Sequence, residues 1–298
     1  MRTARKPDTP LARFVRAYFS SRIATVAAAL LFLLMLLALC APMIAPQDPY
    51  DLMTLDIMDS RLAPGAVAGD GRMTYLMGTD EQGRDMLSAM LYGLRISILV
   101  GFASTAAALV LGLALGLIAG YAGGRIESLI MRIADIQLSF PPILIALVLL
   151  AVSGPGVGKI IIALVAVQWA YYARTARSAA LVERNKEYME AAAGLGLSPL
   201  RIVLRHLLPN CLPPLIVIAA LQVASAISLE ATLSFLGLGL PVTEPSLGLL
   251  ISNGFQYLLS GTYWISFYPG LALLLTVAAI NLVADQLRDV LNPRLQGV

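Results

Sequence analysis

Six long apolar blocks constrain what this chain can fold into more than any other feature. They cover residues 23–44, 96–121, 126–152, 160–180, 212–233 and 268–284. Each block is close to the roughly 20 residues that an α-helix needs to cross about 30 Å of hydrocarbon. Because 58% of the residues are hydrophobic and only 13% are charged, the composition excludes an ordinary soluble domain. The sequence therefore predicts an all-α membrane protein with six transmembrane helices.

Basic residues orient these predicted helices. The first 22 residues contain six Lys or Arg, which favours a cytoplasmic amino terminus because basic flanks stay on the cytoplasmic side. Six crossings then place residues 45–95 outside, and the 181–211 loop and the carboxyl terminus inside. The 45–95 segment has four basic and eight acidic residues, which agrees with this orientation. The net charge of +3 follows from the same bias and gives no reason to expect a nucleic-acid partner.

The predicted organisation has five parts. They are a cytoplasmic tail (1–22), a first membrane helix (23–44), an outer segment (45–95), a core with five membrane helices (96–290) and a second cytoplasmic tail (291–298). The first apolar run is longer than the 7–15 residues of a signal-peptide core, so we expect a retained span rather than a cleaved signal. Cys40 and Cys211 fall on opposite membrane faces, where they cannot form a disulfide within one chain.

The outer segment is rich in Pro, Gly and Asp. Such a segment cannot lie in lipid, where backbone polar groups must be satisfied internally, and we expect a folded outer cap. At its end, Thr79 and Gln82 have the spacing of a capping box. The apolar period from Met86 to Leu94 predicts an amphipathic helix that lies at the outer surface and leads into the second span. The alternative is that residues 78–85 form only a well-capped turn.

Small residues and prolines mark two of the spans. Gly112, Gly116, Gly120 and Gly124 recur at four-residue intervals and predict a packing seam, either within the chain or between subunits. The pair Pro141-Pro142 lies near the middle of the third block and predicts a kinked or opened helix.

Charged and polar residues inside the spans are candidates for function. Arg132 and Asp135 are spaced i, i+3, so we expect them to neutralise each other, with contact to substrate as the alternative. An ionisable group at membrane depth is a functional hypothesis, although near an interface it can also be hydrated or cap a helix. The candidate pathway residues are Gln168, Gln222, Ser225 and Glu230. Polar groups that only join packed helices would give the same pattern.

Catalytic motifs are missing from the sequence. The stretch SGPGVGKI (153–160) fails as a phosphate-binding loop, because Ser153 stands where the first Gly belongs and Ile160 where a hydroxyl is needed. There is no HExxH, no GxSxG and a single histidine, His206. We expect no enzyme activity, no metal and no cofactor in this chain.

The loop at 181–211 interrupts the hydrocarbon-like sequence with YMEAAAGLGLSPLRIVLRHLLPN. Residues 187–193 favour a helix, Gly194 and Gly196 end it, and Ser198-Pro199 starts a second short helix that is expected to end before Pro209. Short helices are marginal alone in water. The small residues 191–193 therefore indicate a surface that docks into a partner, and a solvated connector is the alternative.

These residues resemble a known family. Glu190-Ala191-Ala192, then Gly196, then His206-x-Leu-Pro209 is similar to the EAA motif of permease subunits of bacterial ABC importers, which usually has Ile at the position of His206. Further stretches, GTDEQGRD (78–85), LSFPP (138–142), EATLSFLGLG (230–239) and LRDVLNPRL (287–295), resemble the second permease of the dipeptide, oligopeptide and nickel group. This chain departs from that group in having PSLG (245–248) and NPRL (292–295) where PSWG and DPRL are common.

The resemblance implies a subunit of the bacterial inner membrane that pairs with a second permease. It also implies two ABC ATPases, which carry ATP and magnesium, and a solute-binding protein outside. The implied ATPase-coupling residues are Glu190, Ala191, Ala192, Gly196, Leu197 and Ser198. The implied outer motif is Gly78, Thr79, Asp80, Gly83, Arg84 and Asp85.

Two other classes remain open from the residues alone. One is a secondary transporter or channel driven by an ion gradient, for which Glu230 and Asp135 are the candidate intramembrane acids. The other is a membrane-anchored docking protein that transports nothing. Within the ABC class, nickel chelates and opine-like compounds remain alternatives to peptides.

Overall fold

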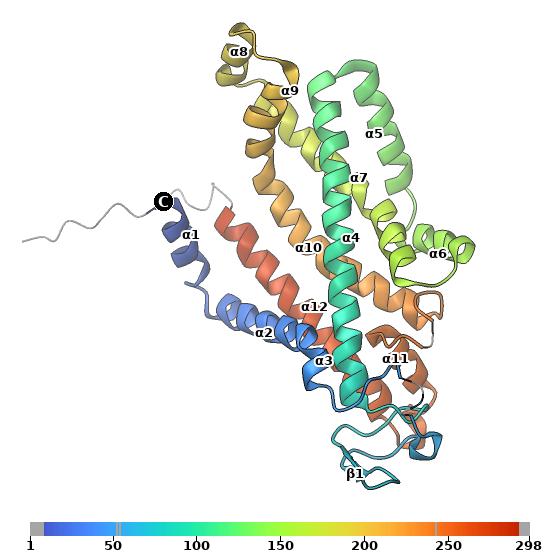
Figure 1. The fold of residues 1–298 in the computed structure, drawn as a ribbon. Coiled ribbons are helices and arrows are strands. Elements are labelled where there is room, and N and C mark those ends of the chain that lie inside the picture. The colour runs from blue at the N-terminus through green and yellow to red at the C-terminus, as the bar shows by residue number, and fades with distance from the viewer. Residues whose placement is uncertain (1–8, 52, 54, 242, 292–298) are drawn as a thin grey trace, which may run out of the picture.

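The computed structural model describes residues 9–51, 53, 55–241 and 243–291, and this part of the chain is mostly helical (Figure 1). The α-helices are α1 (Pro10–Tyr18), α2 (Arg22–Leu39), α3 (Ala41–Ile44), α4 (Met86–Ala122), α5 (Gly124–Leu138), α6 (Pro142–Ser153), α7 (Val157–Arg184), α8 (Glu187–Gly194), α9 (Pro199–Ile202), α10 (Leu208–Phe235), α11 (Leu247–Phe255) and α12 (Trp264–Leu291). Three short turns of other helical types are η1 (Ile57–Asp59), η2 (Val203–Leu207) and η3 (Leu258–Ser260). Strands β1 (Ala66–Val67) and β2 (Thr74–Tyr75) pair antiparallel.

All six predicted apolar blocks are helical, but they are not six equivalent spans. In the described residues, four helices are long and apolar enough to cross a membrane: α2, α4, the continuous Pro199–Phe235 helix and α12. The bent pair α5 and α6 raises the number to five if it forms one span. Helix α7, the fourth block, is not among them, and its last turns carry Arg174, Arg177 and Arg184.

The third block is not one straight helix. Helices α5 and α6 meet at 90° across residues 139–141. The bend follows from Pro141-Pro142, because a residue that precedes proline is disfavoured in the α conformation and proline has no N–H to donate. The kink predicted from the double proline is confirmed.

The second block begins earlier than expected. Helix α4 runs without a break for 37 residues, about 55 Å at 1.5 Å per residue, so the separate amphipathic surface helix is wrong. The capping box at Thr79 and Gln82 is wrong too. Asp85 is the N-cap, and its carboxylate accepts a hydrogen bond from the Ser88 N–H at 2.8 Å. No Pro lies between 86 and 122 to separate a surface helix from the span.

The glycine seam joins α4 to α7 within the chain. A Cβ atom at Gly112 would lie 2.3 Å from the Trp169 carbonyl oxygen, and one at Gly116 would lie 2.5 Å from that of Ala173. At Gly120 the nearest atom would be the Ala180 Cβ at 2.6 Å. Gly124 is the exception, because it begins α5 with φ +57° and faces nothing within 4 Å.

The second loop helix does not stop before Pro209. Helix α9, the π turn η2 and α10 form one continuous helix, Pro199–Phe235. In the π turn the Leu208 N–H bonds to the Val203 carbonyl, five residues back. The hydrogen-bond pattern thus shifts from four to five residues directly before Pro209, which has no N–H to donate. The helix therefore continues at a position where the sequence suggests an end.

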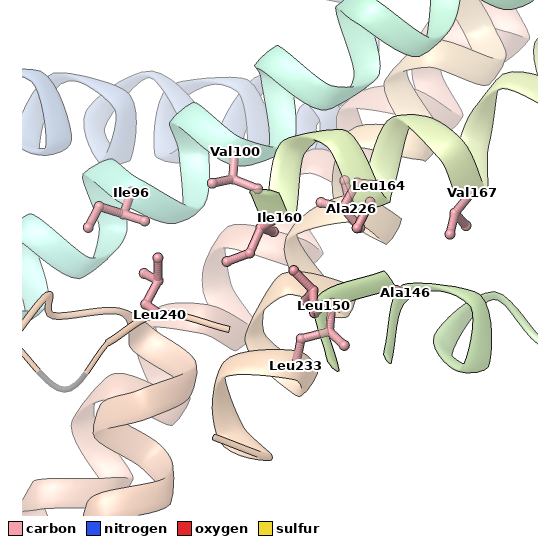
Figure 2. Packing of buried hydrophobic residues seen from close by; sticks show 11 residues of the cluster. Ile96, Val100, Ala146, Leu150, Ile160, Leu164, Val167, Ala226, Leu233 and Leu240 are labelled. Atoms are coloured by element: carbon pink, nitrogen blue, oxygen red, sulfur yellow. The ribbon is translucent and has the colours of Figure 1, made fainter. Parts of the chain in front are cut away.

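One large apolar cluster lies where α4, α6, α7 and α10 meet. It includes Ile96, Val100, Leu150, Ile160 and Leu164, all buried, as Figure 2 shows. A second cluster joins α7 and α10 to α8 and α9. At the amino-terminal end, Tyr18 of α1 packs against Val290 of α12.

The long α4 connects two different ends of the molecule. The β1–β2 hairpin lies at one end of α4, and α8 and α9 lie at the other (Figure 1). Residues 45–85, which contain the hairpin, are called the collar below. The α8–α9 pair with its connecting turn is called the hook.

Candidate functional site

The hook is built as the sequence predicts. Helix α8 covers Glu187–Gly194, and Gly196 follows with φ +71°, a left-handed conformation that glycine adopts without strain. Ser198 then precedes Pro199, the first residue of α9, although its side chain makes no capping hydrogen bond. Two short helices therefore meet at a glycine turn.

One face of the hook is fixed to the rest of the protein. Met189 and Ala192 are buried in the same cluster as Ala180 of α7 and Leu207 of η2. These contacts supply the tertiary packing that so short a helix needs. The hook is therefore part of the packed helical body.

A polar bridge also ties α8 to the ends of α7 and α10. The Tyr188 hydroxyl donates to Glu183 Oε2 at 2.6 Å, and Asn210 Nδ2 donates to the Tyr188 hydroxyl at 3.2 Å. Burial, together with the hydrogen bond to the Glu183 carboxylate, raises the pKa of Tyr188 to about 12. Burial opposes ionisation of Glu183, but hydrogen bonds from Lys186 and Tyr188 outweigh it and lower the pKa of Glu183. The bridge is therefore intact at neutral pH, with Glu183 ionised and Tyr188 protonated.

The opposite face of the hook is open. Glu190, Ala191, Gly196 and Ser198 are exposed, and Leu197 is half-buried. Ala192 is the only one of the six predicted coupling residues that the structure buries, with 4% of its surface exposed. Pattern alone did not identify three further large apolar side chains on this surface, Leu195, Leu200 and Leu204, all of which are exposed. Leu195 lies in the turn and Leu200 in α9, so exposed apolar side chains lie on both sides of Gly196.

The predicted pathway residues occupy different environments. Gln168 is buried, accepts from the Thr105 hydroxyl of α4 at 3.4 Å and donates to the Gln222 carbonyl of α10 at 3.2 Å. This arrangement matches the alternative of a hydrogen bond between packed helices. Gln222 is half-buried and Ser225 is exposed.

Two hydroxyl residues extend the accessible side of α10. Ser228 and Thr232 continue from Ser225 at helical spacing and line a cavity of about 310 Å³ with Phe235 and Ile251. Each hydroxyl donates to the carbonyl four residues earlier, which leaves its lone pairs free to accept. Their i, i+3, i+7 spacing was readable in the sequence, but single hydroxyls in a membrane helix give a weak signal.

Glu230 is fully buried where α4, α10 and α11 meet. The Ser97 hydroxyl of α4 donates to one carboxyl oxygen at 2.9 Å, and the Ser234 hydroxyl donates to the other at 2.8 Å. Ser246, the N-cap of α11, is a third hydrogen-bond partner. A Cβ at Gly248 would lie 2.2 Å from the Ala231 carbonyl oxygen. The stretches EATLSFLGLG and PSLG thus form one polar junction.

The outer motif folds into a tight, buried turn. Asp80 and Arg84 form an ion pair at 2.7 Å with both side chains fully buried. The Asp80 carboxylate also accepts from the backbone N–H groups of Gln82 and Arg84. The carboxylate end of the pair is therefore also held by backbone hydrogen bonds within the collar.

Neighbouring motif residues attach this turn to the helices. Thr79 donates its hydroxyl to the Asp59 carbonyl, and its own carbonyl accepts from Trp264 Nε1 of α12 at 3.2 Å. Gly78 and Gly83 have positive φ values. A Cβ at Gly83 would lie 2.1 Å from the Asp56 carbonyl oxygen. Burial raises the pKa of Asp85, although hydrogen bonds from Ser88 oppose the shift. The six outer-motif residues therefore connect the rest of the collar to α4 and α12.

Ion pairs between α5 and α7 differ from the expectation. Asp135 pairs with Arg174 of α7, not with Arg132, and Arg177 Nε pairs with Glu127 at 2.7 Å. The i, i+3 pair is therefore wrong, because a partner 39 residues away in sequence satisfies the carboxylate. Within the described residues, no group of three His, Cys, Asp or Glu side chains could hold a metal ion.

Long apolar helices surround a buried polar junction, with a packed hook at one end and a polar collar at the other, and this arrangement defines a multi-helix membrane protein. Over residues 112–297 the chain matches the family described as binding-protein-dependent transport system inner membrane component. Over residues 9–64 it matches the N-terminal TM domain of oligopeptide transport permease C. The chain belongs to this family of transport permeases.

Individual relatives cover nearly the whole chain. It is 38% identical to the di/tripeptide transport system permease protein DppC of Pseudomonas aeruginosa, over 97% of this chain and 94% of the relative. It is 41% identical to the dipeptide transport system permease protein DppC of Escherichia coli K12, over 97% of this chain and 95% of the relative. Among solved structures, a chain of the inward-facing MetNI methionine ABC transporter is similar in fold, with a TM-score of 0.57 and 21% identity over 70% of this chain and 98% of that one. This chain is thus a permease component of an ABC importer.

Proposed function

We propose that this chain is one of two permease subunits that form the pathway of an ATP-driven importer for dipeptides or closely related short peptides. The observation that supports this substrate class is that the chain is 36–41% identical to several dipeptide permeases over almost its entire length. In this proposal the chain crosses the bacterial inner membrane six times, with both termini and the hook inside and the collar outside. The bent pair α5–α6 forms the third crossing and α7 the fourth.

The proposed partner proteins have different roles. Two ABC ATPases bind ATP and magnesium and contact the hook of each permease, while an external solute-binding protein delivers the peptide to the collar side. Closure of the ATPases moves the hook. Because Tyr188 and the buried Met189 and Ala192 tie the hook to α7 and α10, the movement passes to those helices and switches access to the pathway. The accessible polar side of α10, with Gln222, Ser225, Ser228 and Thr232, is the proposed lining.

Charge reversal on the hook tests this function. Glu190→Arg should reduce dipeptide uptake by about tenfold or more while basal ATP hydrolysis by the assembled complex continues, because the contact is lost but the body of the protein is intact. The assay is uptake of a labelled dipeptide in a strain that lacks the native gene and carries the variant. Gly196→Asp, which places a side chain at φ +71°, should act in the same direction.

Glu187→Arg is the matched control, because it makes the same charge change one turn earlier in α8, outside the EAA-like motif. It should retain most of the uptake. Normal transport by Glu190→Arg would show that the hook does not couple ATP hydrolysis to transport. Uptake that follows an ion gradient and persists without the ATPases would instead favour a secondary transporter.

A further inference from the structure

A groove between α2 and α4 has no role in the transport cycle described above. It encloses about 500 Å³ and is lined by Phe32, Met35, Leu36, Ala38, Leu39, Arg95, Ile98 and Leu99. Its volume falls in the range of small-molecule sites, roughly 300–1,000 Å³. All of its lining is apolar except for a single cation, Arg95.

The groove follows from the sequence of both helices. Helix α2 contributes Phe32, Leu36 and Leu39 along one face, and all three are exposed. Ala38 is buried and small, so the two helices approach each other closely beneath a wall of larger side chains. Helix α4 supplies Arg95 and, one turn later, Leu99, also on one face.

Two observations give the depth of Arg95 in the membrane. Helix α2 begins at Arg22 and has 18 residues, about 27 Å, so its end at Leu39 lies close to the far headgroup boundary. Tyr92, one turn before Arg95, packs edge-on against Tyr50 of the collar with ring centroids 5.3 Å apart. Tyrosines gather at the membrane interface. Arg95 therefore lies where hydrocarbon gives way to phosphate groups.

Arg95 is exposed and forms no ion pair with a carboxylate in the part of the chain that the structure describes. Its charge acts on the collar, because burial and Glu244 raise the pKa of Tyr50 whereas Arg95 lowers it. A guanidinium binds a phosphate through two parallel hydrogen bonds. A partner helix would have to bring its own carboxylate to this position, whereas a phospholipid already carries an anion at this depth.

We propose that the α2–α4 groove is a binding site for an anionic phospholipid. The phosphate group is held by Arg95, and one acyl chain lies along Leu36, Leu39 and Leu99. The lipid fills the gap between the first membrane helix and α4, just below the collar.

A photoreactive benzoylphenylalanine at position 99 tests the proposal in the full transporter. The complex is reconstituted in nanodiscs with equal amounts of phosphatidylglycerol and phosphatidylcholine, and the lipid that crosslinks on illumination is identified by mass spectrometry. We expect phosphatidylglycerol to exceed phosphatidylcholine. Arg95→Gln should reduce this preference by about fivefold, since a basic residue near an anionic surface contributes about 1 kcal/mol. Arg95→Lys should retain part of it.

The same probe at the exposed Val110 of α4, which has no Lys or Arg within one helical turn along the chain, is the control and should show no such preference. If Arg95→Gln fails to assemble, Leu39→Glu serves instead, because it places a carboxylate beside Arg95 and should also abolish the preference. An unchanged lipid ratio in these variants would overturn the proposal. Crosslinks from position 99 to a second protein chain rather than to lipid would overturn it as well.

Discussion

At the scale of single residues, the collar depends on one buried ion pair. Asp80 and Arg84 have no exposed side-chain surface, so Asp80→Asn removes the carboxylate that pairs with a buried guanidinium. Loss of one partner of a buried pair destabilises a protein by about 3–5 kcal/mol. We expect the collar of Asp80→Asn to be cleaved by protease at lower temperature than that of the parent protein in detergent.

Asp70 provides the matched control for that change. Its pair with Arg72 is exposed, with a separation of 3.4 Å, and such pairs contribute about 0–1 kcal/mol. Asp70→Asn should leave the cleavage temperature nearly unchanged. Equal behaviour of the two variants would show that the buried pair does not hold the collar together.

A variant of Tyr188 can distinguish attachment of the hook to α7 and α10 from docking of the hook to an ATPase. Tyr188→Phe removes the hydroxyl that bridges Glu183 and Asn210 but keeps the ring. We expect uptake to fall several-fold while ATPase association, measured by co-purification, is unchanged. Tyr171→Phe, on α7 outside this bridge, should transport normally. Parallel loss of ATPase binding and uptake in Tyr188→Phe would mean that the bridge shapes the docking surface instead.

At the scale of elements, the seam between α4 and α7 tolerates no added atoms. An alanine at Gly116 would place its Cβ 2.5 Å from the Ala173 carbonyl oxygen and 2.6 Å from the Ala176 Cβ. Forcing these helices apart should cost about 1–3 kcal/mol. The measurement is the thermal unfolding midpoint in detergent, which should fall for Gly116→Ala.

Gly270 in α12 is the comparison, because a Cβ there meets nothing within 4 Å. Gly270→Ala should be neutral or stabilise the helix by up to about 1 kcal/mol, since alanine has the higher helix propensity. An unchanged midpoint for Gly116→Ala would mean that the seam is looser than its contacts imply.

Local signals in the sequence predicted the local elements well. The helix predicted at 187–193, the glycine turn and the break at Pro141-Pro142 depend on propensity and on missing N–H groups, which act over a few residues. The sequence could not give the partners of polar groups that lie far apart in the chain. Asp135 pairs with Arg174, and Glu230 bonds to Ser97, 133 residues away. Such contacts depend on how helices pack, and so does the continuation of α9 through Pro209.

At the scale of the whole molecule, the hook and the collar lie at opposite ends of α4 (Figure 1). The proposed topology requires a membrane between them, since α4 is about 55 Å long and the hydrocarbon core is about 30 Å thick. Cysteine labelling can decide the arrangement. The background replaces Cys40 and Cys211 with alanine, and single cysteines are introduced at Met58 in the collar or Leu195 in the hook, both highly exposed.

A membrane-impermeant maleimide should label Met58→Cys in intact spheroplasts and Leu195→Cys only after permeabilisation. The expectation follows from charge as well as length, because six basic residues precede the first span and six more lie between Arg174 and Arg205, and basic flanks remain inside. A cysteine at Thr9 should behave like the one at Leu195, since an even number of crossings separates them. Labelling of Thr9→Cys and Leu195→Cys from opposite sides would mean that α5–α6 or α7 does not cross. The hook could then not meet ATPases on the same side as the amino terminus.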